Sequence, residues 1–392
     1  MSYLAIDAAR SGREGWEWVP LRRVTRLRRE PNTDASWPLL ALSSERGVEP
    51  RPDDGGRQLP SEETVTSYWR VHPNDLVFNP MWAIGGGVAV SHVSGAVSPA
   101  YHVYSPTPVL YPRFLHHVMR SRTAIDQYQL LVRGITTFDR SVTREDLGDM
   151  PVPVPPLDEQ RAIADYLDRE TARIDALIAA KERMIALLQE RWRVAVTAEM
   201  ARLAAIHGTI QLRHLIRCLD GRRVPLSAEE RAGWHGCFPY YGASAIVDWV
   251  DGWLFDEPLV LLGEDGAQLG DPSYPIAQAV SGKIWVNNHA HVLRPVHVDP
   301  AFLTLRLNTV DRIPVMSGGT REKITQDDMN RIPVPNIPIS HQSEIGSELD
   351  GIRARCDGLS ATIRRQIALL SERRQALVTA AVTGQVEVPV AA

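Results

Sequence analysis

Two short stretches of the chain carry residue types that bind DNA. Glycines, hydroxyls and basic side chains alternate in Arg133-Gly134-Ile135-Thr136, with Arg140 nearby, and in Ser317-Gly318-Gly319-Thr320-Arg321, with Lys323 nearby. Glycine lets the backbone approach a ligand closely, hydroxyls and amides bind phosphate, and Arg or Lys can reach a phosphate or a guanine edge. Ordinary turn chemistry explains any single member equally well. The candidate DNA contacts are Arg133, Thr136, Arg140, Ser317, Thr320, Arg321 and Lys323, with Tyr240 and Tyr241 as weaker candidates.

A catalytic alternative rests on Asn79-Pro80-Met81-Trp82. Adenine methyltransferases hold a flipped base with an Asn/Asp-Pro-Pro-aromatic turn, but here the third residue is Met. Gly85-Gly86-Gly87 alone is a weak sign of a nucleoside cofactor site. A stand-alone adenine methyltransferase using Asn79 therefore stays as an alternative, and we expect no catalytic residue and no cofactor.

Three histidines raise the question of a metal site. His102, His289 and His291 flank strand-like runs, but no third and fourth ligands stand at a convincing spacing. We therefore expect no metal and hydrogen-bonded or buried histidines. Cys218, Cys237 and Cys356 form no CxxC pattern, which favours reduced structural cysteines.

A long internal repeat determines which elements position these residues. Residues 143–198 align with residues 325–380 at a constant offset of 182, without a gap, so that Gln160 aligns with Gln342 and Asp175 with Asp357. Shared composition cannot produce such an alignment. The period is also far longer than the roughly 20 to 50 residues of solenoid repeats, so each unit is a whole domain with an appendage.

Each repeat predicts an extended connector followed by a long helix. The connectors, residues 150–156 and 332–338, are rich in proline, which avoids helix, and Asp158 and Ser340 follow as candidate N-caps. Apolar residues then recur at gaps of three, four and seven over about 40 residues, roughly 60 Å of helix. We expect the two helices to pair antiparallel and to place the two globular domains at opposite ends of a rod. The spacer and partner-binding candidates are Ile163, Leu167, Ile174, Leu188, Ile345, Leu349, Ile363 and Leu370, in a stripe that also includes Leu177 and Leu359.

The composition is that of a soluble globular protein of two or three domains, with 392 residues, 44% hydrophobic and 23% charged. No apolar run reaches the roughly 18 residues that span a bilayer, and residues 1–11 lack the pattern of a signal peptide, so we expect a cytoplasmic protein without a membrane partner. The net charge of −4 argues only weakly against DNA, because the distribution of charge matters more than its total.

The motifs together closely resemble the specificity subunit of type I restriction-modification enzymes, over nearly the whole chain. The resemblance lies in residues 76–103 and 281–292, in the connectors with Leu157-Asp158-Glu159-Gln160, and in the duplicated helix. Two features depart from the family pattern: a tight Pro239-Tyr240-Tyr241-Gly242 turn is present only in the second domain, and Ser340-His341-Gln342 replaces the usual acidic start of the second helix.

The resemblance implies a mixed α/β fold with two target recognition domains joined by two long helices that form an antiparallel coiled coil. It assigns residues 1–150 and 208–332 to the recognition domains, and 151–207 and 333–392 to the connectors, helices and tail. It implies a non-catalytic subunit in phage defence whose domains each recognise one half of a bipartite, asymmetric double-stranded DNA target. Its implied partners are two methyltransferase subunits, with motor-nuclease subunits in the full complex. A coiled-coil scaffold with protein-binding end domains is the remaining alternative.

Overall fold

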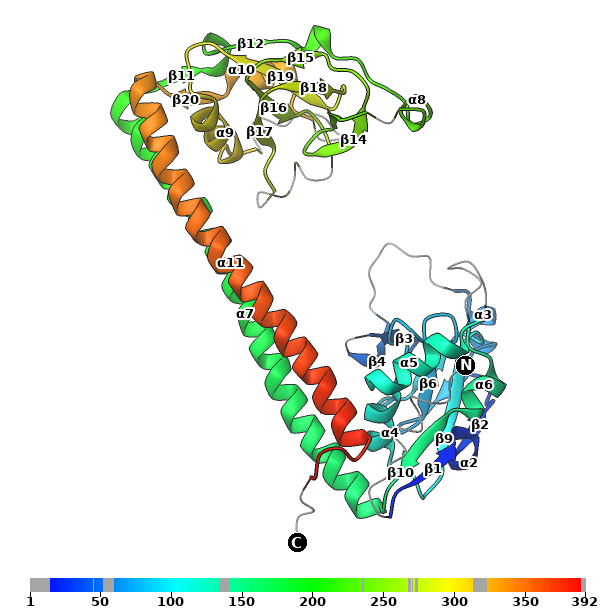
Figure 1. The fold of residues 1–392 in the computed structure, drawn as a ribbon. Coiled ribbons are helices and arrows are strands. Elements are labelled where there is room, and N and C mark those ends of the chain that lie inside the picture. The colour runs from blue at the N-terminus through cyan, green and yellow to red at the C-terminus, as the bar shows by residue number, and fades with distance from the viewer. Residues whose placement is uncertain are drawn as a thin grey trace. The chain divides into compact units, whose positions relative to one another are not determined.

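The computed structural model describes residues 15–44, 46–51, 60–133, 141–234, 236–266, 269, 271, 274–312 and 323–388. The chain divides into two compact units: unit 1 is Met1–Ala180 with Arg365–Ala392, and unit 2 is Lys181–Arg364. Each unit holds one mixed α/β domain and part of each of two long helices (Figure 1).

A four-stranded antiparallel sheet forms the centre of the unit 1 domain. Its strand order is β2 (Thr25–Arg28), β9 (His102–Pro106), β6 (Leu76–Phe78), β7 (Val88–Val90). Side chains alternate across a strand, so Leu76 and Phe78 of β6 pack on the core beneath α4 (Pro112–Met119) and α5 (Arg122–Leu131), whereas Val77 packs in a second core on the opposite face. Strand β6 ends at Phe78, directly before Asn79.

The second core of this domain is closed by two short strand pairs. These pairs are β3 (Leu40–Ser43) with β4 (Gly47–Pro50), and β5 (Trp69–Val71) with β8 (Gly95–Val97). The remaining elements of the domain are α2 (Leu21–Val24), α3 (Glu62–Thr66) and α6 (Arg144–Asp149).

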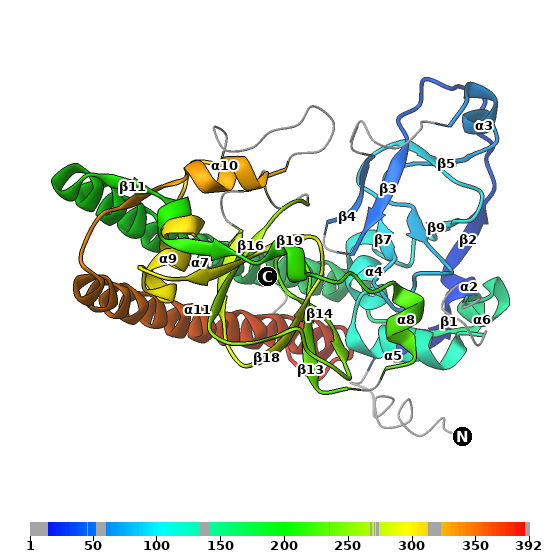
Figure 2. The same ribbon diagram turned by 90° about the horizontal axis from the view of Figure 1, so that it is seen from above.

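The unit 2 domain repeats this plan. Its antiparallel sheet has the order β12 (Ile216–Cys218), β19 (Ala290–Pro295), β16 (Leu259–Gly263), β17 (Ala277–Val280). Val260 and Leu262 of β16 pack on the core that contains α9 (Pro300–Asn308), and Leu261 packs on the other face. Figure 2 shows α9 beside this sheet. The central strands β6 and β16 therefore occupy the same place in two central sheets of one strand order.

The outer sheet of the unit 2 domain is larger than the two strand pairs of unit 1. It has the order β14 (Ile246–Val250), β13 (Phe238–Tyr241), β18 (Lys283–Val286), β15 (Phe255–Asp256). The predicted tight turn at residues 239–242 is wrong in part, because residues 238–241 form strand β13 with a bulge between Tyr240 and Tyr241. The short helical elements are η1 (Leu212–His214), η2 (Asp220–Arg222), α8 (Ala228–Ala232) and α10 (Gln326–Arg331).

Both proline connectors are extended, as predicted. Strand β10 (Pro151–Val154) pairs with β1 (Glu17–Pro20), and β20 (Pro333–Pro335) pairs with β11 (Thr209–Gln211), both antiparallel. Each connector therefore belongs to a small sheet with the start of its own domain.

The long helices are longer than the sequence pattern indicates. Helix α7 runs over Leu157–His207, 51 residues, and α11 over Ile339–Val382, 44 residues. The prediction that Asp158 and Ser340 are N-caps is wrong, because both residues lie inside the helix, one residue after its start. None of the described helices has an apolar stretch long enough to cross a bilayer.

The two helices pack against each other in both units and run in opposite directions, which confirms the predicted pairing (Figure 1). In unit 1, Ile163 and Leu167 of α7 share a core with Val378 of α11, and Asp175 forms a 2.9 Å ion pair with Arg374. In unit 2, Leu349 of α11 shares a core with residues of the second part of α7, including Val196, Met200 and Leu203.

A buried glutamine joins each helix to its domain. Gln160 accepts a hydrogen bond from the Tyr111 amide (2.7 Å) and donates to the carbonyls of Val109 (2.9 Å) and Pro155 (2.8 Å). Its repeat equivalent Gln342 accepts from the Asp299 amide (2.8 Å) and donates to the Ile337 carbonyl (2.8 Å). Tyr111 and Asp299 are the N-cap residues of α4 and α9. The joint is therefore duplicated together with the helix.

Unit 1 strengthens its joint with an ion cluster. Asp168 of α7 contacts Nε2 of His117 at 2.7 Å and accepts from Nε of Arg113 at 2.7 Å, and Arg113 also pairs with Asp165 at 2.9 Å. Burial disfavours the carboxylate, but the hydrogen bonds from His117 and Arg113 outweigh it and lower the pKa of Asp168 to about 2. Counting from the N-caps of α4 and α9, Ala301 and Leu305 stand at the corresponding places in unit 2.

Candidate nucleic-acid interface

In unit 1 the structure places the predicted stretch at Arg133 beside the loop that follows β6. Arg133 and Ser141 exchange two backbone hydrogen bonds of 3.0 Å, and the Val142 amide donates to the Pro80 carbonyl at 3.1 Å. The Arg133 side chain is exposed and reaches Asp146 at 3.0 Å. The candidates Thr136 and Arg140 lie outside the described residues.

Unit 2 has the same arrangement at Lys323. Lys323 forms an isolated bridge with Asp265, and the Ile324 amide donates to the Glu264 carbonyl at 2.9 Å, in the loop that follows β16. The Lys323 ammonium lies 3.3 Å from the Glu264 carboxylate. The candidates Ser317, Thr320 and Arg321 lie outside the described residues. Both domains thus share one arrangement. The loop after the central strand is hydrogen-bonded to the segment before the short helix (α6 or α10), at one edge of the sheet where the central strand ends.

A chain of charged groups supports this edge in unit 2. Glu264 accepts from Arg223 at 3.0 Å, and Nδ1 and Nε2 of His291 lie 2.6 Å from the Asp220 carboxylate and 2.8 Å from the Ile324 carbonyl. Burial disfavours the imidazolium, but the hydrogen bonds to Asp220 and Ile324 outweigh it and raise the pKa of His291.

In unit 1 the matching histidine, His102, has a lowered pKa, the opposite of His291. His102 stands opposite Phe78 in the sheet, as His291 stands opposite Leu262. Its Nδ1 is buried without a partner, and burial together with the charge of Arg29 lowers the pKa of His102. Among the described residues no cluster of His, Cys, Asp or Glu could hold a metal ion.

The loop after β6 is closed by its own backbone. The Trp82 amide donates to the Asn79 carbonyl (3.1 Å), and the Gly87 amide donates to the Trp82 carbonyl (2.9 Å). The Asn79 side chain accepts from the Met81 amide at 3.1 Å, so its oxygen is engaged in the turn. Two large apolar side chains remain outside: Met81 is 58% exposed and Trp82 is 42% exposed.

The tyrosine candidates differ in placement. Tyr240 is 2% exposed, its hydroxyl accepts from the Leu226 amide at 3.0 Å, and the Arg231 guanidinium lies over its ring. This placement suits packing better than contact with a partner. Tyr241 is half-buried, and burial raises its pKa.

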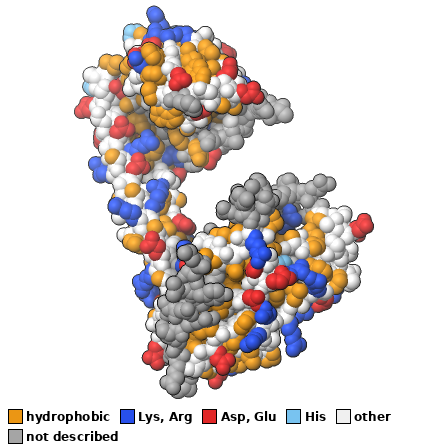
Figure 3. Space-filling model, turned by 45° about the vertical axis from the view of Figure 1, so that its right-hand side comes forward, with side chains coloured by type: hydrophobic (Ala, Val, Ile, Leu, Met, Phe, Trp, Pro, Cys, Tyr) orange, Lys and Arg blue, Asp and Glu red, His pale blue; other side chains and the backbone are white. Residues whose placement is uncertain are grey.

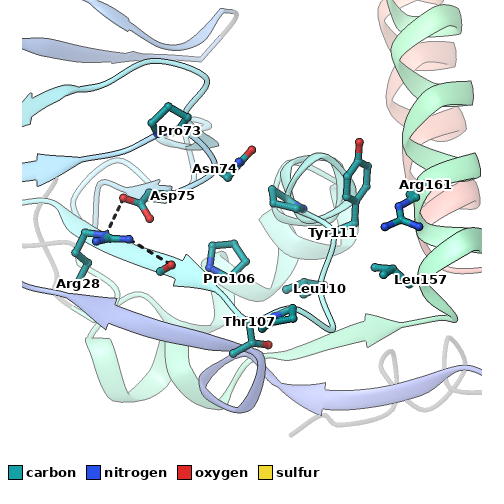
Figure 4. A pocket seen from close by; sticks show the side chains of 13 residues that line it. Arg28, Pro73, Asn74, Asp75, Pro106, Thr107, Leu110, Tyr111, Leu157 and Arg161 are labelled. Carbon is teal, nitrogen blue, oxygen red and sulfur yellow. Dashed lines mark hydrogen bonds and ion pairs between the residues drawn. The ribbon is translucent and has the colours of Figure 1, made fainter.

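A polar recess lies between the unit 1 domain and the start of α7 (Figure 4). The Arg28 guanidinium pairs there with Asp75 at 2.9 Å, and Arg161 pairs with Asp158 at 3.1 Å. Because both arginines already have carboxylate partners, the recess offers little net charge to an anionic ligand.

The helix candidates are buried or half-buried. Ile163, Leu167, Ile174, Leu349 and Ile363 are buried, and Leu188, Ile345 and Leu370 are half-buried. These eight side chains are therefore occupied by packing within the chain.

The stripe predicted from sequence is wrong at Leu177 and Leu359, which are 46% and 55% exposed. Leu187 and Leu369 are 68% and 64% exposed. These four residues, the outward leucines, form two repeat-equivalent pairs at the offset of 182, Leu177 with Leu359 and Leu187 with Leu369. The offset alone could not have singled them out, because the half-buried Leu188 and Leu370 share it. Along the helices in Figure 3, Lys and Arg are interspersed with Asp and Glu, so no charge of one sign dominates the face in view.

Parts of the chain are similar to specificity proteins of type I restriction enzymes. Residues 219–369 match the type I restriction modification DNA specificity domain. A protein of Haemophilus influenzae named as a type I restriction enzyme specificity subunit is 36% identical over 137 residues, which are 35% of this chain and 34% of that protein. The type I restriction enzyme EcoDI specificity subunit of Escherichia coli is 26% identical over 179 residues, 45% of this chain and 38% of that subunit. The matches thus span little more than a third of these relatives' length.

The fold as a whole also has a solved counterpart. A chain from a structural study of complex assembly and conformational transition of the type I R-M system superposes with a TM-score of 0.68 at 19% identity, covering 95% of this chain and 99% of that one. The HsdS subunit from Thermoanaerobacter tengcongensis gives a TM-score of 0.49 at 19% identity, over 96% of this chain and 98% of that one.

Proposed function

Because the chain belongs to the family of type I restriction-modification specificity subunits, we propose that it recognises DNA for such a system and that each α/β domain reads one half of a split target. The observation that carries this proposal is the duplicated joint. Two domains of one strand order are each held on a long helix by the same buried glutamine, Gln160 or Gln342. A repeated recognition domain on a repeated support is what a bipartite target requires.

The target is asymmetric in this proposal, since the loops after β6 and β16 carry different side chains. Each bidentate contact to a base pair contributes about 1 to 3 kcal/mol of discrimination, so one short block alone would give little selectivity. The helices fix the number of unread base pairs between the blocks, at roughly 1.5 Å of helix per residue.

The outward leucines support the proposed docking of two methyltransferase subunits. Exposed large apolar side chains in groups commonly mark protein interfaces. Because the leucines recur at the repeat offset, with Leu177 and Leu369 in unit 1 and Leu187 and Leu359 in unit 2, they suit two copies of one partner. Motor-nuclease subunits would join this core to form the restriction complex.

We assign no catalytic residue to this chain in the proposed complex and place the complex in the cytoplasm. The Asn79 side chain supports this assignment, because its oxygen already accepts a hydrogen bond within its own turn. The segments 1–150, 151–207, 208–332 and 333–392 are our proposed recognition domains and spacers.

The test is co-expression of this chain with the methyltransferase subunit encoded beside its gene, followed by mapping of methylated adenines across the DNA by single-molecule sequencing. We expect one split, asymmetric motif that is present only when both chains are present. Methylation that is unchanged when this chain is deleted would contradict the proposal and favour a scaffold.

A further inference from the structure

The loop after β6 in unit 1 carries an exposed apolar tip, Met81 and Trp82. A Cβ atom at Gly85 would overlap the Trp82 ring, and one at Gly87 would lie 2.7 Å from the Trp82 carbonyl oxygen. Gly86 has φ +85°, a conformation that favours glycine. The Trp82 ring therefore packs closely on Gly85, while 42% of the residue stays exposed.

The tip is anchored beside the predicted DNA-binding stretch. The Val142 amide donates to the Pro80 carbonyl, directly before Met81, and the exposed Arg133 lies on the same paired segment. The tip thus lies beside the segment that carries the exposed Arg133, whose guanidinium pairs with Asp146 at 3.0 Å.

The same position in unit 2 keeps the anchorage and changes the chemistry. There the Ile324 amide donates to the Glu264 carbonyl, but Glu264 and Asp265 stand where unit 1 has Pro80 and Met81. The Asp265 carboxylate contacts Nδ1 of His289 at 2.9 Å. By contrast, the joint glutamine and the N-caps Thr143 and Thr325 are the same in both units. The loops after β6 and β16 therefore share a backbone anchorage but differ in their exposed side chains. Two domains that read different bases need such a difference.

We propose that Met81 and Trp82 contact the bases of the half-site read by the unit 1 domain, through apolar and stacking contacts and not through phosphates. Thymine methyl groups and base faces are the apolar surfaces that DNA offers, and methionine serves as an apolar wedge between base steps in other DNA-binding proteins. The inference rests on the proposed function, because it presumes that the domain binds DNA.

The experiment uses the complex of the full chain with its methyltransferase subunits and a duplex that carries the mapped methylation motif. The variant is Met81→Ala with Trp82→Ala. Its matched control is Leu130→Ala, an exposed apolar residue on α5 of the same unit. Binding is measured by fluorescence anisotropy over a series of salt concentrations, and again with duplexes altered in one block at a time.

We expect the double variant to bind about tenfold more weakly or worse, since one stacked base contributes about that factor. Discrimination should fall in one block only, and the salt dependence should be unchanged because no phosphate contact is lost. Met81→Leu with Trp82→Phe should restore binding to within about threefold of the wild type, which separates contact from misfolding.

Wild-type affinity in the alanine variant would overturn the inference. So would a smaller salt dependence, which indicates phosphate contacts, or a loss of methyltransferase binding with DNA affinity intact, which indicates a protein contact. Failure to map any motif would instead refute the proposed function, so the two failures are distinguishable.

Discussion

The buried glutamine joint leads to a quantitative prediction for Gln160→Met and Gln342→Met. Methionine has nearly the volume of glutamine, so the substitutions remove hydrogen bonds without opening a large cavity. Gln160 is 0% exposed and makes three hydrogen bonds to backbone groups, whereas Gln342 is 3% exposed and makes two. At about 1 kcal/mol for each hydrogen bond, we expect losses of about 3 and about 2 kcal/mol in the free energy of unfolding.

The assay is urea unfolding of each variant, together with hydrogen exchange of the Tyr111 and Asp299 amides. Gln160→Met should accelerate exchange at Tyr111 but not at Asp299, and Gln342→Met should do the reverse, because each amide loses its only described acceptor. The control is Gln189→Met, an exposed position on α7 that should change neither quantity. Losses below about 1 kcal/mol, or unchanged exchange at the matching amide, would refute the hydrogen-bond account of the joint.

Three further predictions follow from the helices and their joints. Asp168→Asn should destabilise the protein at neutral pH. Since the folded pKa of Asp168, about 2, lies below the unfolded value of about 3.9, this loss of stability should shrink as pH falls from about 4 to about 2 in thermal melts, and a loss that does not change with pH would refute the ion-cluster account. Replacing Leu177 and Leu369 by Ser, or Leu187 and Leu359 by Ser, should each reduce the methyltransferase content of the complex from two copies to one in native mass spectrometry, and retention of both copies would exclude these surfaces. Inserting four residues after Ala180 and after Arg364 adds about 6 Å to each helix and should lengthen the unread spacer of the methylated motif by about two base pairs, so an unchanged spacer would refute the spacer role.

Elements with a regular period could be predicted from the sequence, and their ends could not. Proline excludes helix in the connectors, and a 3.6-residue apolar period identifies the long helices. The helices nevertheless extend to His207 and Val382, beyond the repeat at residues 198 and 380, because their last turns are buried by Met200, Leu203 and Ala381 against the domains. This burial depends on tertiary contacts, which the apolar period of the sequence does not reveal.

The sequence singled out candidate residues for the site but not their neighbours in the fold. The stretches at Arg133 and Lys323 were chosen for residue type, yet their proximity to Pro80 and Glu264 arises from backbone hydrogen bonds across more than fifty residues of sequence. Tyr240 was chosen as a paired tyrosine, and the structure buries it. Gln160 and Gln342 were visible as a matched pair, but their partners are backbone groups, which carry no signal in the sequence.

That last property has an evolutionary consequence. In the glutamine bonds the helix contributes the side chain, while the domain contributes the amide that begins α4 or α9 and, in unit 1, one carbonyl. The Asp168 cluster of unit 1 adds two domain side chains, Arg113 and His117. Backbone groups are the same whatever the sequence, so a recombination event that replaced a whole domain would preserve these bonds as long as the new domain began a helix at that place. The chain can thus acquire a new domain sequence in one genetic exchange and keep the glutamine bonds that attach the domain to its helix.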